Sequence, residues 1–310
     1  MNSRILVSGV SGPIGAALLP SLRAGGSSVV RLVRRGPTVG ARGGARGGAQ
    51  DDEQIAWDPA QPISPEAVSG FDAVIHLAGE SIIGRWTAAK KQKIRNSRVA
   101  GTGNLAQALA KASVRPRVFI SSSAIGYYGD RGDEILKEES AVGSGFLPDV
   151  CREWEEATEA AAKAGIRTVQ IRTGIVLSAA GGALAKMLTP FKLGVGGIVG
   201  SGRQWMSWID VQDMVGAIQH IMKTDRLRGP VNLAAPTPVR NAEFTKTLAS
   251  VLSRPAIFPM PAFVVKLVFG EMGETVLLGS QRVEPGQLVA SGYPFQFRVL
   301  QASLKAMLGH

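Results

Sequence analysis

The stretch ILVSGVSGPIG, residues 5–15, decides the fold of this chain. Its apolar start predicts a strand over Arg4–Ser8, and the apolar spacing after it predicts a helix over Ile14–Ala24. Three glycines stand between these elements: one permits a tight turn, one lets the backbone approach a pyrophosphate, and one lets the helix pack on the strand. We therefore expect a dinucleotide-binding loop. Its predicted contact residues are Gly9, Ser11, Gly12, Pro13, Ile14 and Gly15.

The rest of the first half alternates strands and helices. Strands are predicted over Ser28–Val33, Ala73–Leu77, Val118–Ser121 and Thr168–Thr173, and helices over Thr87–Ala112 and Leu147–Ala164. Such alternation is typical of parallel βαβ units. The expected fold class is α/β, with a Rossmann-type doubly wound parallel sheet. A glycine-rich turn without a ligand is the alternative for residues 9–15, and the βαβ order makes it the weaker one.

The pattern changes after Gly174, where glycine and proline become frequent. We expect a smaller, mostly C-terminal α+β substrate domain. It would hold helices over Val211–Lys223 and Ala242–Leu252, the second with Asn241 as its N-cap. The expected boundaries are 1–175 for the nucleotide-binding Rossmann domain and 176–310 for the substrate-side region, with a small C-terminal domain over 257–305. Later segments such as 205–235 are free to return to the first domain.

The composition of the 310-residue chain is that of a globular protein, with 45% hydrophobic and 19% charged residues. Its apolar runs are too short for a membrane span, and its single cysteine, Cys151, fits a reducing compartment. The net charge of +11 is spread along the chain and forms no nucleic-acid-binding motif. We expect a cytoplasmic monomer or homodimer with a small-molecule substrate, and no nucleic acid, membrane or metal partner.

The end of the second strand predicts which dinucleotide binds. NAD-binding domains usually place an acidic residue there, which accepts a hydrogen bond from the ribose hydroxyls. Here the strand runs into Arg34 and Arg35, and the next carboxylate is Asp51. Guanidinium groups form charge-assisted bonds with a 2′-phosphate. The expected cofactor is therefore NADP(H), unless both arginines are solvated loop residues.

Several segments follow one another in an order that resembles a known family. They are FDAVIHLAGE, RWTAAKKQKIRNSR, SSSAIGYYGDRGDE, VCREWE, IRTGIVLS, GGALAKMLTPFKLGVGG, GSGRQWMSWIDVQD and GPVNLAAPTPVRNAEF. With the glycine loop, they resemble the atypical extended short-chain dehydrogenase/reductases of the NAD-dependent epimerase/dehydratase-like group. That group includes sugar-nucleotide epimerases and ends in a small C-terminal domain of unknown function. The resemblance implies cofactor contacts for Leu77, Ala78, Gly79, Arg98, Ser121 and Val176.

The chain departs from hydride-transferring relatives at the residues that carry the chemistry. Those relatives use a Tyr-x-x-x-Lys pair on the helix after the serine strand, with the tyrosine as general acid/base. No tyrosine here has a lysine four positions later, and VCREWEEA stands where the pair belongs. The superfamily's serine is present as Ser123. Candidate substitutes are Tyr127, Tyr128 and, if partly desolvated, Glu80; each can instead be structural, Glu80 through a cap or an ion pair.

The run GSGRQWMSWIDVQD is expected to face the substrate. Arg203 offers a phosphate-type donor, and Trp205 and Trp208 offer flat surfaces suited to a nucleotide or sugar-nucleotide. Two functions stay open at this point. One is an NADP-dependent oxidoreductase or epimerase, acting on an unidentified substrate, whose acid/base group has been relocated. The other is an NADPH-binding sensor or regulatory protein without turnover.

Overall fold

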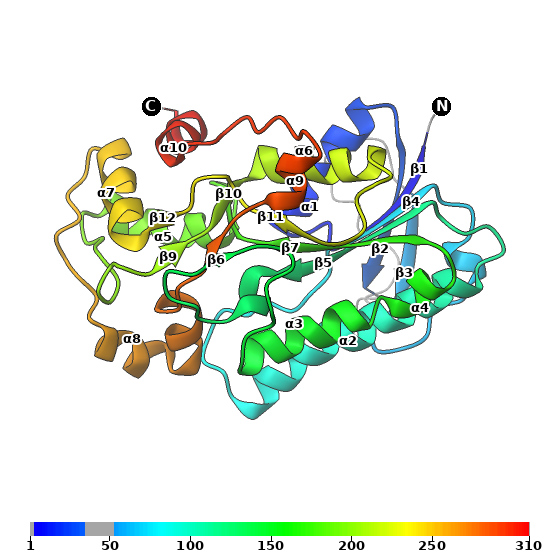
Figure 1. Ribbon diagram of the computed structural model, residues 1–310, viewed down its shortest axis with the longest axis horizontal. Coiled ribbons are helices and arrows are strands. Elements are labelled where there is room, and N and C mark those ends of the chain that lie inside the picture. Colours follow the sequence, from blue (N-terminus) through cyan, green and yellow to red (C-terminus); the bar gives the residue numbers. More distant parts are fainter. Residues whose placement is uncertain (1–2, 35–52, 310) are drawn as a thin grey trace, which may run out of the picture.

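The computed structural model describes residues 3–34 and 53–309 of the chain. Its centre is a sheet of seven parallel strands (Figure 1). In spatial order the strands are β11 (Gly229–Leu233), β7 (Arg167–Thr173), β5 (Val118–Ala124), β4 (Ala73–His76), β1 (Arg4–Ser8), β2 (Ser28–Arg34) and β3 (Gln54–Trp57). The order reverses between β1 and β4, and ligands of such sheets bind outside the carboxyl ends of the strands at that point. The predicted Rossmann-type α/β fold is confirmed.

Helices cover both faces of the sheet. Successive residues of β1 are apolar, so the strand buries side chains on both faces beneath these helices. Ile5 and Val7 pack toward α1 (Pro13–Ala24), α6 (Val211–Lys223) and α9 (Gly286–Ala290). Leu6 between them packs toward the other face, with α2 (Ala88–Lys111) and α4 (Glu159–Lys163). The helix α3 (Phe146–Glu156) runs beside α2 on this second face (Figure 1).

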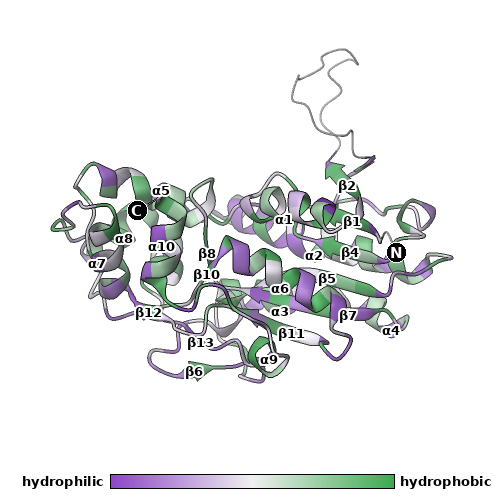
Figure 2. Cartoon of the chain, turned by 90° about the horizontal axis from the view of Figure 1, so that it is seen from above, coloured by the Kyte–Doolittle hydropathy of each residue, from purple (hydrophilic) through white to green (hydrophobic). Residues whose placement is uncertain are grey.

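A second hydrophobic core lies beyond the carboxyl ends of the sheet strands (Figure 2). Two small sheets border it: β8 (Ile175–Leu177) with β10 (Trp208–Asp210), and β9 (Trp205–Met206) with β12 (Val239–Arg240). Three helices enclose it: α5 (Gly182–Lys192), α7 (Asn241–Val251) and α10 (Leu300–Leu308). The pair β6 (Ile135–Leu136) and β13 (Arg282–Val283) and the helix α8 (Ala262–Phe269) complete this end of the molecule.

The chain returns from this second core to the central sheet over residues 211–233. The helix α6 packs on α1, where the Gln219 side chain donates a hydrogen bond to Ser21 Oγ at 3.0 Å. The strand β11 then pairs with β7 at the edge of the sheet. Residues 205–210, by contrast, form β9 and β10 outside the sheet.

Three expected details differ from the structure. The helix expected over Leu147–Ala164 is divided into α3 and α4 at Ala157 and Thr158, where the Thr158 amide donates to the Glu155 carbonyl three residues back. The Thr158 hydroxyl donates to the same carbonyl and accepts a hydrogen bond from Gln170 of β7. The helix α7 begins at Asn241 rather than after it, and Arg240 is its N-cap. The four-residue strand β3 is absent from the expected elements.

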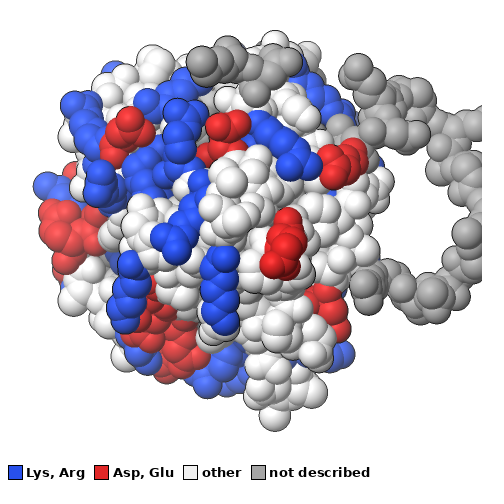
Figure 3. Space-filling model, turned by 90° about the vertical axis from the view of Figure 1, so that its right-hand side faces the viewer, with Lys and Arg blue, Asp and Glu red and all other residues white. Residues whose placement is uncertain are grey.

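Lys and Arg side chains lie among Asp and Glu side chains over the face shown in Figure 3, so the net charge of +11 forms no single basic stripe there. Within the ranges described, none of the helices combines the length and the apolar character that crossing a bilayer demands.

Candidate functional site

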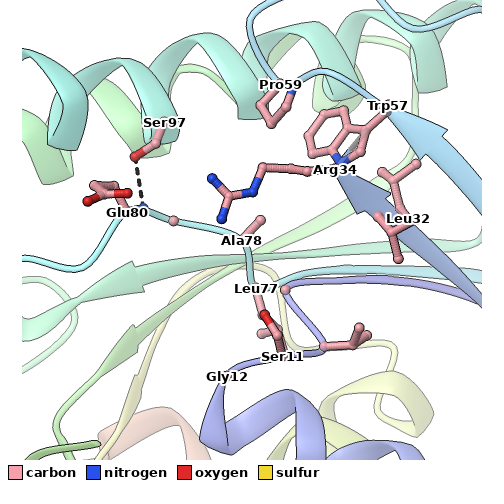
Figure 4. A pocket seen from close by; sticks show the side chains of 14 residues that line it. Ser11, Gly12, Leu32, Arg34, Trp57, Pro59, Leu77, Ala78, Glu80 and Ser97 are labelled. Carbon is pink, nitrogen blue, oxygen red and sulfur yellow. Dashed lines mark hydrogen bonds between the residues drawn. The ribbon is translucent and has the colours of Figure 1, made fainter. Parts of the chain in front are cut away.

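A pocket of about 400 Å³ opens at the carboxyl ends of β1, β2 and β4, where the strand order reverses (Figure 4). Its lining residues come from the glycine loop, the ends of β2 and β3, the segment after β4, and α2. They are Gly9, Val10, Ser11, Gly12, Leu32, Val33, Arg34, Trp57, Pro59, Leu77, Ala78, Gly79, Glu80 and Ser97. The pocket thus brings together residues from Gly9 to Ser97 of the sequence.

The three glycines of the loop have three different environments. Gly9 has a φ of +75°, and a Cβ there would lie 2.5 Å from the Leu77 carbonyl carbon, so only glycine allows the loop to cross the end of β4. A Cβ on Gly15 would lie 2.6 Å from the Gly9 oxygen, so this glycine packs the helix against the loop itself rather than against the strand.

Gly12 is open toward the pocket. It is the N-cap of α1, and a Cβ there would meet only the Gly9 oxygen, at 3.5 Å. Pro13 follows at the first helical position, where a missing N–H removes no hydrogen bond. The unpaired amides of the first turn and the positive end of the helix dipole favour an anion beside this loop. The loop therefore fits a phosphate-containing cofactor.

Arg34 ends β2 and extends across the pocket toward the Ala78–Glu80 segment, with Trp57 and Pro59 on one side (Figure 4). Arg35 lies outside the described residues. Trp57 and Pro59 are pocket residues that the sequence reasoning missed. The signal was faint, because β3 has only four residues and follows a glycine-rich stretch. The pocket thus presents a guanidinium where NAD-binding domains present a carboxylate.

Glu80 carries a carboxylate at this pocket, and Lys90 binds it. Lys90 Nζ lies 2.7 Å from Glu80 Oε1, and this hydrogen bond holds the pKa of the carboxyl below its usual value. A general base that works by desolvation would need the opposite shift. The alternative of an ion pair describes its contacts, and the role of a desolvated base stays a prediction.

His76 lies beneath the pocket at the end of β4. Its Nδ1 is 2.7 Å from Ser8 Oγ of β1, and its ring meets the edge of the Trp57 ring at a centroid distance of 5.8 Å. The side chain is fully buried, and burial lowers the pKa of its imidazole to about 4. A neutral histidine thus links the two strand ends that carry the pocket.

A second polar cluster lies at the ends of β5 and β7. Arg172 of β7 is 3% exposed and binds both oxygens of Glu155 at 2.8 Å, and the Ser123 hydroxyl donates to Glu155 Oε1 at 2.6 Å. The sequence reasoning missed Arg172. An arginine inside the otherwise apolar strand run VQIRTG was the signal that could have found it.

The two tyrosines after β5 have different surroundings. The Arg172 guanidinium carbon stands 3.5 Å from the centroid of the Tyr127 ring, which is partly buried. Tyr128 is fully buried; its hydroxyl donates to Asn232 Oδ1 at 2.7 Å and accepts from Arg172 Nη1 at 3.0 Å. Burial raises the pKa of Tyr128 to about 12. Tyr128 is thus held as part of the core, and the role of proton carrier expected for it conflicts with this burial.

Two residues four positions apart on α3 face the end of β5. A Cβ on Gly126 would lie 3.6 Å from Leu147 and 3.7 Å from Cys151 Sγ. These positions have the spacing of the Tyr-x-x-x-Lys pair and carry neither residue. Cys151 is buried, and burial raises the pKa of its thiol to about 12.

The remaining residues predicted to contact the cofactor lie beside the pocket or away from it. Arg98 abuts Gly79 of the pocket wall. Ser121 is fully buried in β5, and Val176 packs against the first core; neither of them lines the pocket. Trp205 is partly exposed, between the guanidinium groups of Arg240 and Arg282 at 4.4 and 4.7 Å.

Trp208 is placed differently from its prediction. It is fully buried in the second core, and its Nε1 donates to the Thr237 carbonyl. The expectation that it offers a surface to the substrate is wrong, because the side chain on a three-residue strand beside β8 faces inward. Arg203 stays exposed, with its carbonyl oxygen bonded by Arg240.

Comparison with known proteins agrees with this architecture. Residues 5–234 match the model of the NAD dependent epimerase/dehydratase family, and residues 260–307 match a domain of unknown function, DUF1731. An epimerase family protein of Mycobacterium bovis is 40% identical over 305 residues, which cover 98% of this chain and 97% of that protein.

Two solved structures add to this. The crystal structure of human epimerase family protein SDR39U1 with NADPH is 34% identical, with a TM-score of 0.87 over 99% of both chains. MoeE5 in complex with UDP-glucuronic acid and NAD is 19% identical, with a TM-score of 0.78 over 99% of this chain and 98% of that one, and shows the shared fold alone. The match over residues 5–234 and the whole-length relatives show that the chain belongs to the NAD dependent epimerase/dehydratase family.

Proposed function

We propose that the pocket binds NADP(H), with the adenosine 2′-phosphate on Arg34 and the pyrophosphate on the loop Gly9–Gly15. The observation that carries the proposal is the guanidinium of Arg34 at the end of β2, inside the pocket. A carboxylate at that place would repel a 2′-phosphate, whereas a guanidinium binds it through charge-assisted bonds. The NADPH in the related human structure supports the same choice of cofactor.

The remaining predicted contacts belong to this proposal. Leu77, Ala78 and Gly79 line the pocket where the cofactor would pass from β1 to β4. Ser121 and Val176 are proposed on the resemblance alone, and Arg35 is proposed because it follows Arg34 in the sequence. When bound, the cofactor supplies hydride-transfer chemistry.

We also propose how the chain divides into domains, from which elements pack on the central sheet and which share the second core. Residues 1–175 would form the cofactor domain, with the returning part of 205–235, because α6 and β11 pack on the sheet. The rest of 176–310 would form the substrate side, including 257–305, because its helices share a separate core.

Binding is tested on Arg34→Ala. We expect the variant to lose about 10- to 100-fold in affinity for NADPH, since a hydrogen bond to a charged group contributes about 1.5–3 kcal/mol. Affinity for NADH should change less than about threefold. Titration calorimetry with both dinucleotides measures this, and Lys111→Ala, an exposed cation at the far end of α2, is the matched control. Equal losses for NADPH and NADH would contradict the proposal.

For the reaction, we propose oxidoreductase or epimerase chemistry on a small carbonyl or sugar-nucleotide substrate, with Tyr127 as proton carrier. Tyr127 is favoured over the other two candidates because Tyr128 is buried with its hydroxyl bonded to Asn232, and Glu80 is held in an ion pair with Lys90. The Ser123 hydroxyl, fixed by Glu155, would orient the reacting oxygen. Arg203 and Trp205 would contact the far end of the substrate.

The test is NADPH oxidation followed over a panel of carbonyl compounds and sugar-nucleotides. Tyr127→Phe should lower turnover by about 100-fold or more at unchanged NADPH affinity. Tyr128→Phe should instead lower the free energy of unfolding. If Tyr128→Phe abolishes turnover while the fold stays as stable, the assignment to Tyr127 is wrong.

One observation favours a second function, an NADPH-binding sensor or regulatory protein without turnover. No tyrosine of the chain has a lysine four positions later, so the acid/base pair of hydride-transferring relatives is missing from its sequence. Tight NADPH binding with no oxidation by any substrate of the panel would support this function over the first.

A further inference from the structure

The end of the molecule that holds α8, opposite α4 and β3 in Figure 1, exposes an apolar surface. Ten large hydrophobic side chains of the described chain are more than half exposed, and seven of them lie on two short segments at this end. A single exposed apolar side chain is ordinary, whereas a cluster of this size indicates a contact with a partner. The seven are Leu193 and Val195 after α5, Ile257 and Phe258 before α8, and Phe263, Leu267 and Val268 on α8.

The two segments lie side by side, so their exposed side chains form one surface. Residues 196–200 run parallel to residues 258–260, and the Met260 amide donates a hydrogen bond to the Ile198 carbonyl at 2.8 Å. The chain then enters α8 through Pro261, which is the N-cap of this helix. We call the seven side chains together the apolar tip.

The helix α8 contributes three side chains to the apolar tip. Its one polar residue is Lys266, and Val265 is the residue that it buries completely. Phe263 and Leu267 are four positions apart, so they share one face of the helix, and they are 71% and 73% exposed. Side chains exposed to this degree stand out from the surface rather than line a groove. The apolar tip therefore suits insertion into a fluid apolar layer better than docking of a rigid protein.

The sequence around the apolar tip carries charges of one sign. Residues 182–209 and 244–270 include both segments, and they contain six Lys or Arg residues and no Asp or Glu. Two of these cations, Lys192 and Arg254, are exposed and form no ion pair with any residue that the structure describes. The rim of the apolar tip is therefore cationic.

The charges also indicate which partner fits. The acids that follow α8 are already engaged, Glu271 with Lys91 and Glu274 with Lys266. A second copy of this chain docked tip to tip would bring the unpaired cations of both copies together, and like charges would oppose that contact. An anionic lipid surface instead offers phosphates to the cations and acyl chains to the apolar side chains.

We propose that the apolar tip binds the surface of an anionic lipid bilayer. Phe258, Phe263 and Leu267 enter the boundary between headgroups and acyl chains, and Lys192 and Arg254 lie on the lipid phosphates. The expectation of no membrane partner came from apolar runs too short to span a bilayer, and binding to its surface needs no such run. The contact is separate from the proposed cofactor site, because no residue of the apolar tip lines the pocket.

Vesicle binding tests the proposal on the full chain. Co-sedimentation is measured with vesicles of phosphatidylcholine alone and with vesicles of equal amounts of phosphatidylcholine and phosphatidylglycerol. We expect the wild type to bind the mixed vesicles at least about tenfold more tightly, because each cation near an anionic surface adds to the attraction. Concentrated sodium chloride should weaken this binding, since salt screens exposed charges.

Variants of α8 test the apolar contact. Phe263→Gln with Leu267→Gln should lower the affinity for mixed vesicles by about tenfold or more, because two apolar side chains no longer leave water. Val114→Gln, which changes an exposed apolar side chain at the other end of the molecule, is the control and should bind as the wild type does. The fluorescence added by Phe263→Trp should be quenched by lipids with brominated acyl chains, and that added by Val114→Trp should not.

A second pair of variants tests the charges. Lys192→Glu with Arg254→Glu should lower the affinity for mixed vesicles by about tenfold or more and should change binding to phosphatidylcholine little. Lys111→Glu with Arg228→Glu removes two exposed cations near the amino ends of the sheet strands and is the matched control. Thermal unfolding and NADPH titration of every variant should match the wild type. Phe263→Trp, which stays apolar, decides the contact if the glutamine pair does not fold.

The results separate the possible partners. Equal binding to both kinds of vesicle, or folded tip variants that bind as the wild type does, overturns the proposal. Binding to polyglutamate without binding to vesicles overturns it in favour of an acidic protein. A wild-type dimer that Phe263→Gln with Leu267→Gln dissociates, again without vesicle binding, overturns it in favour of a second copy. Vesicle binding by a protein that does not bind NADPH would count against the proposed function alone.

Discussion

The pocket at the carboxyl ends of β1, β2 and β4 and the cluster around Arg172 lie at the same edge of the sheet but are built in different ways. The pocket depends on backbone: Gly9 crosses the end of β4, and Gly12 caps α1. The cluster depends on side chains, with Glu155 of α3 held between Ser123 of β5 and Arg172 of β7. A backbone site tolerates few changes at glycines and many elsewhere. A side-chain site can be rebuilt one residue at a time, which is how a family can keep a cofactor site while its chemistry varies.

The sharpest test of this contrast is Glu155→Gln. The variant keeps the shape of the side chain but leaves the Arg172 guanidinium, 3% exposed, without a counter-charge. Breaking a buried pair in this way costs about 3–5 kcal/mol of unfolding free energy, which urea denaturation measures. Glu156→Gln, which removes the exposed partner of Arg152, is the control and should change stability little. Similar results for both variants would show that the ion pair does not hold the cluster.

The pocket is tested by two glycines of the same loop. Gly9→Ala forces a Cβ to within 2.5 Å of the Leu77 backbone at a φ of +75° and should cost about 3 kcal/mol of stability. Gly12→Ala has room, with its nearest contact at 3.5 Å. It should keep the fold and lower NADPH affinity alone. Denaturation and dinucleotide titration measure the two effects, and a stable Gly9→Ala variant would remove the backbone argument.

A third test concerns His76, the side-chain contact beneath the pocket. Its pKa is about 4 in the folded protein and 6.5 in the unfolded chain, so the unfolded chain takes up a proton first as pH falls. Its contribution to stability is therefore complete above pH 6.5 and lost between 6.5 and 4, by about 3 kcal/mol in total. Denaturation from pH 7 to 4 measures this against His76→Asn, which does not titrate. Parallel pH profiles for the two proteins would exclude a buried neutral histidine.

The smallest effect is expected for Glu80→Gln. The ion pair with Lys90 is partly solvated, with the two side chains 33% and 22% exposed, so its loss should cost less than about 1 kcal/mol. Turnover, where it is found, should persist. A loss of turnover as large as that of Tyr127→Phe would return Glu80 to the catalytic candidates.

The same contrast explains which residues of the site could be predicted from the sequence. The glycine loop and Arg34 were predictable because their neighbours are set by the local strand–turn–helix and by the strand end. Trp57 was not, because its strand is short and follows a glycine-rich stretch.

The cluster could not be predicted in the same way. The pairing of Glu155 with Arg172 and the burial of Trp208 and Tyr128 depend on which elements become neighbours in space. Residue type indicated that these groups could be functional. Only their environment shows that Tyr128 and Trp208 are core residues and that Tyr127 stands against a cation.

The late return of the chain to the sheet has a consequence for dissecting the protein. The strand β11 pairs with β7 only after more than fifty intervening residues, which form much of the second core. A fragment ending at residue 175 would keep the glycine loop but leave β7 as an uncovered edge strand, with its amides and carbonyls unpaired. Such an edge invites intermolecular strand pairing. A soluble fragment that carries the pocket therefore needs β11, although no residue of β11 lines the pocket.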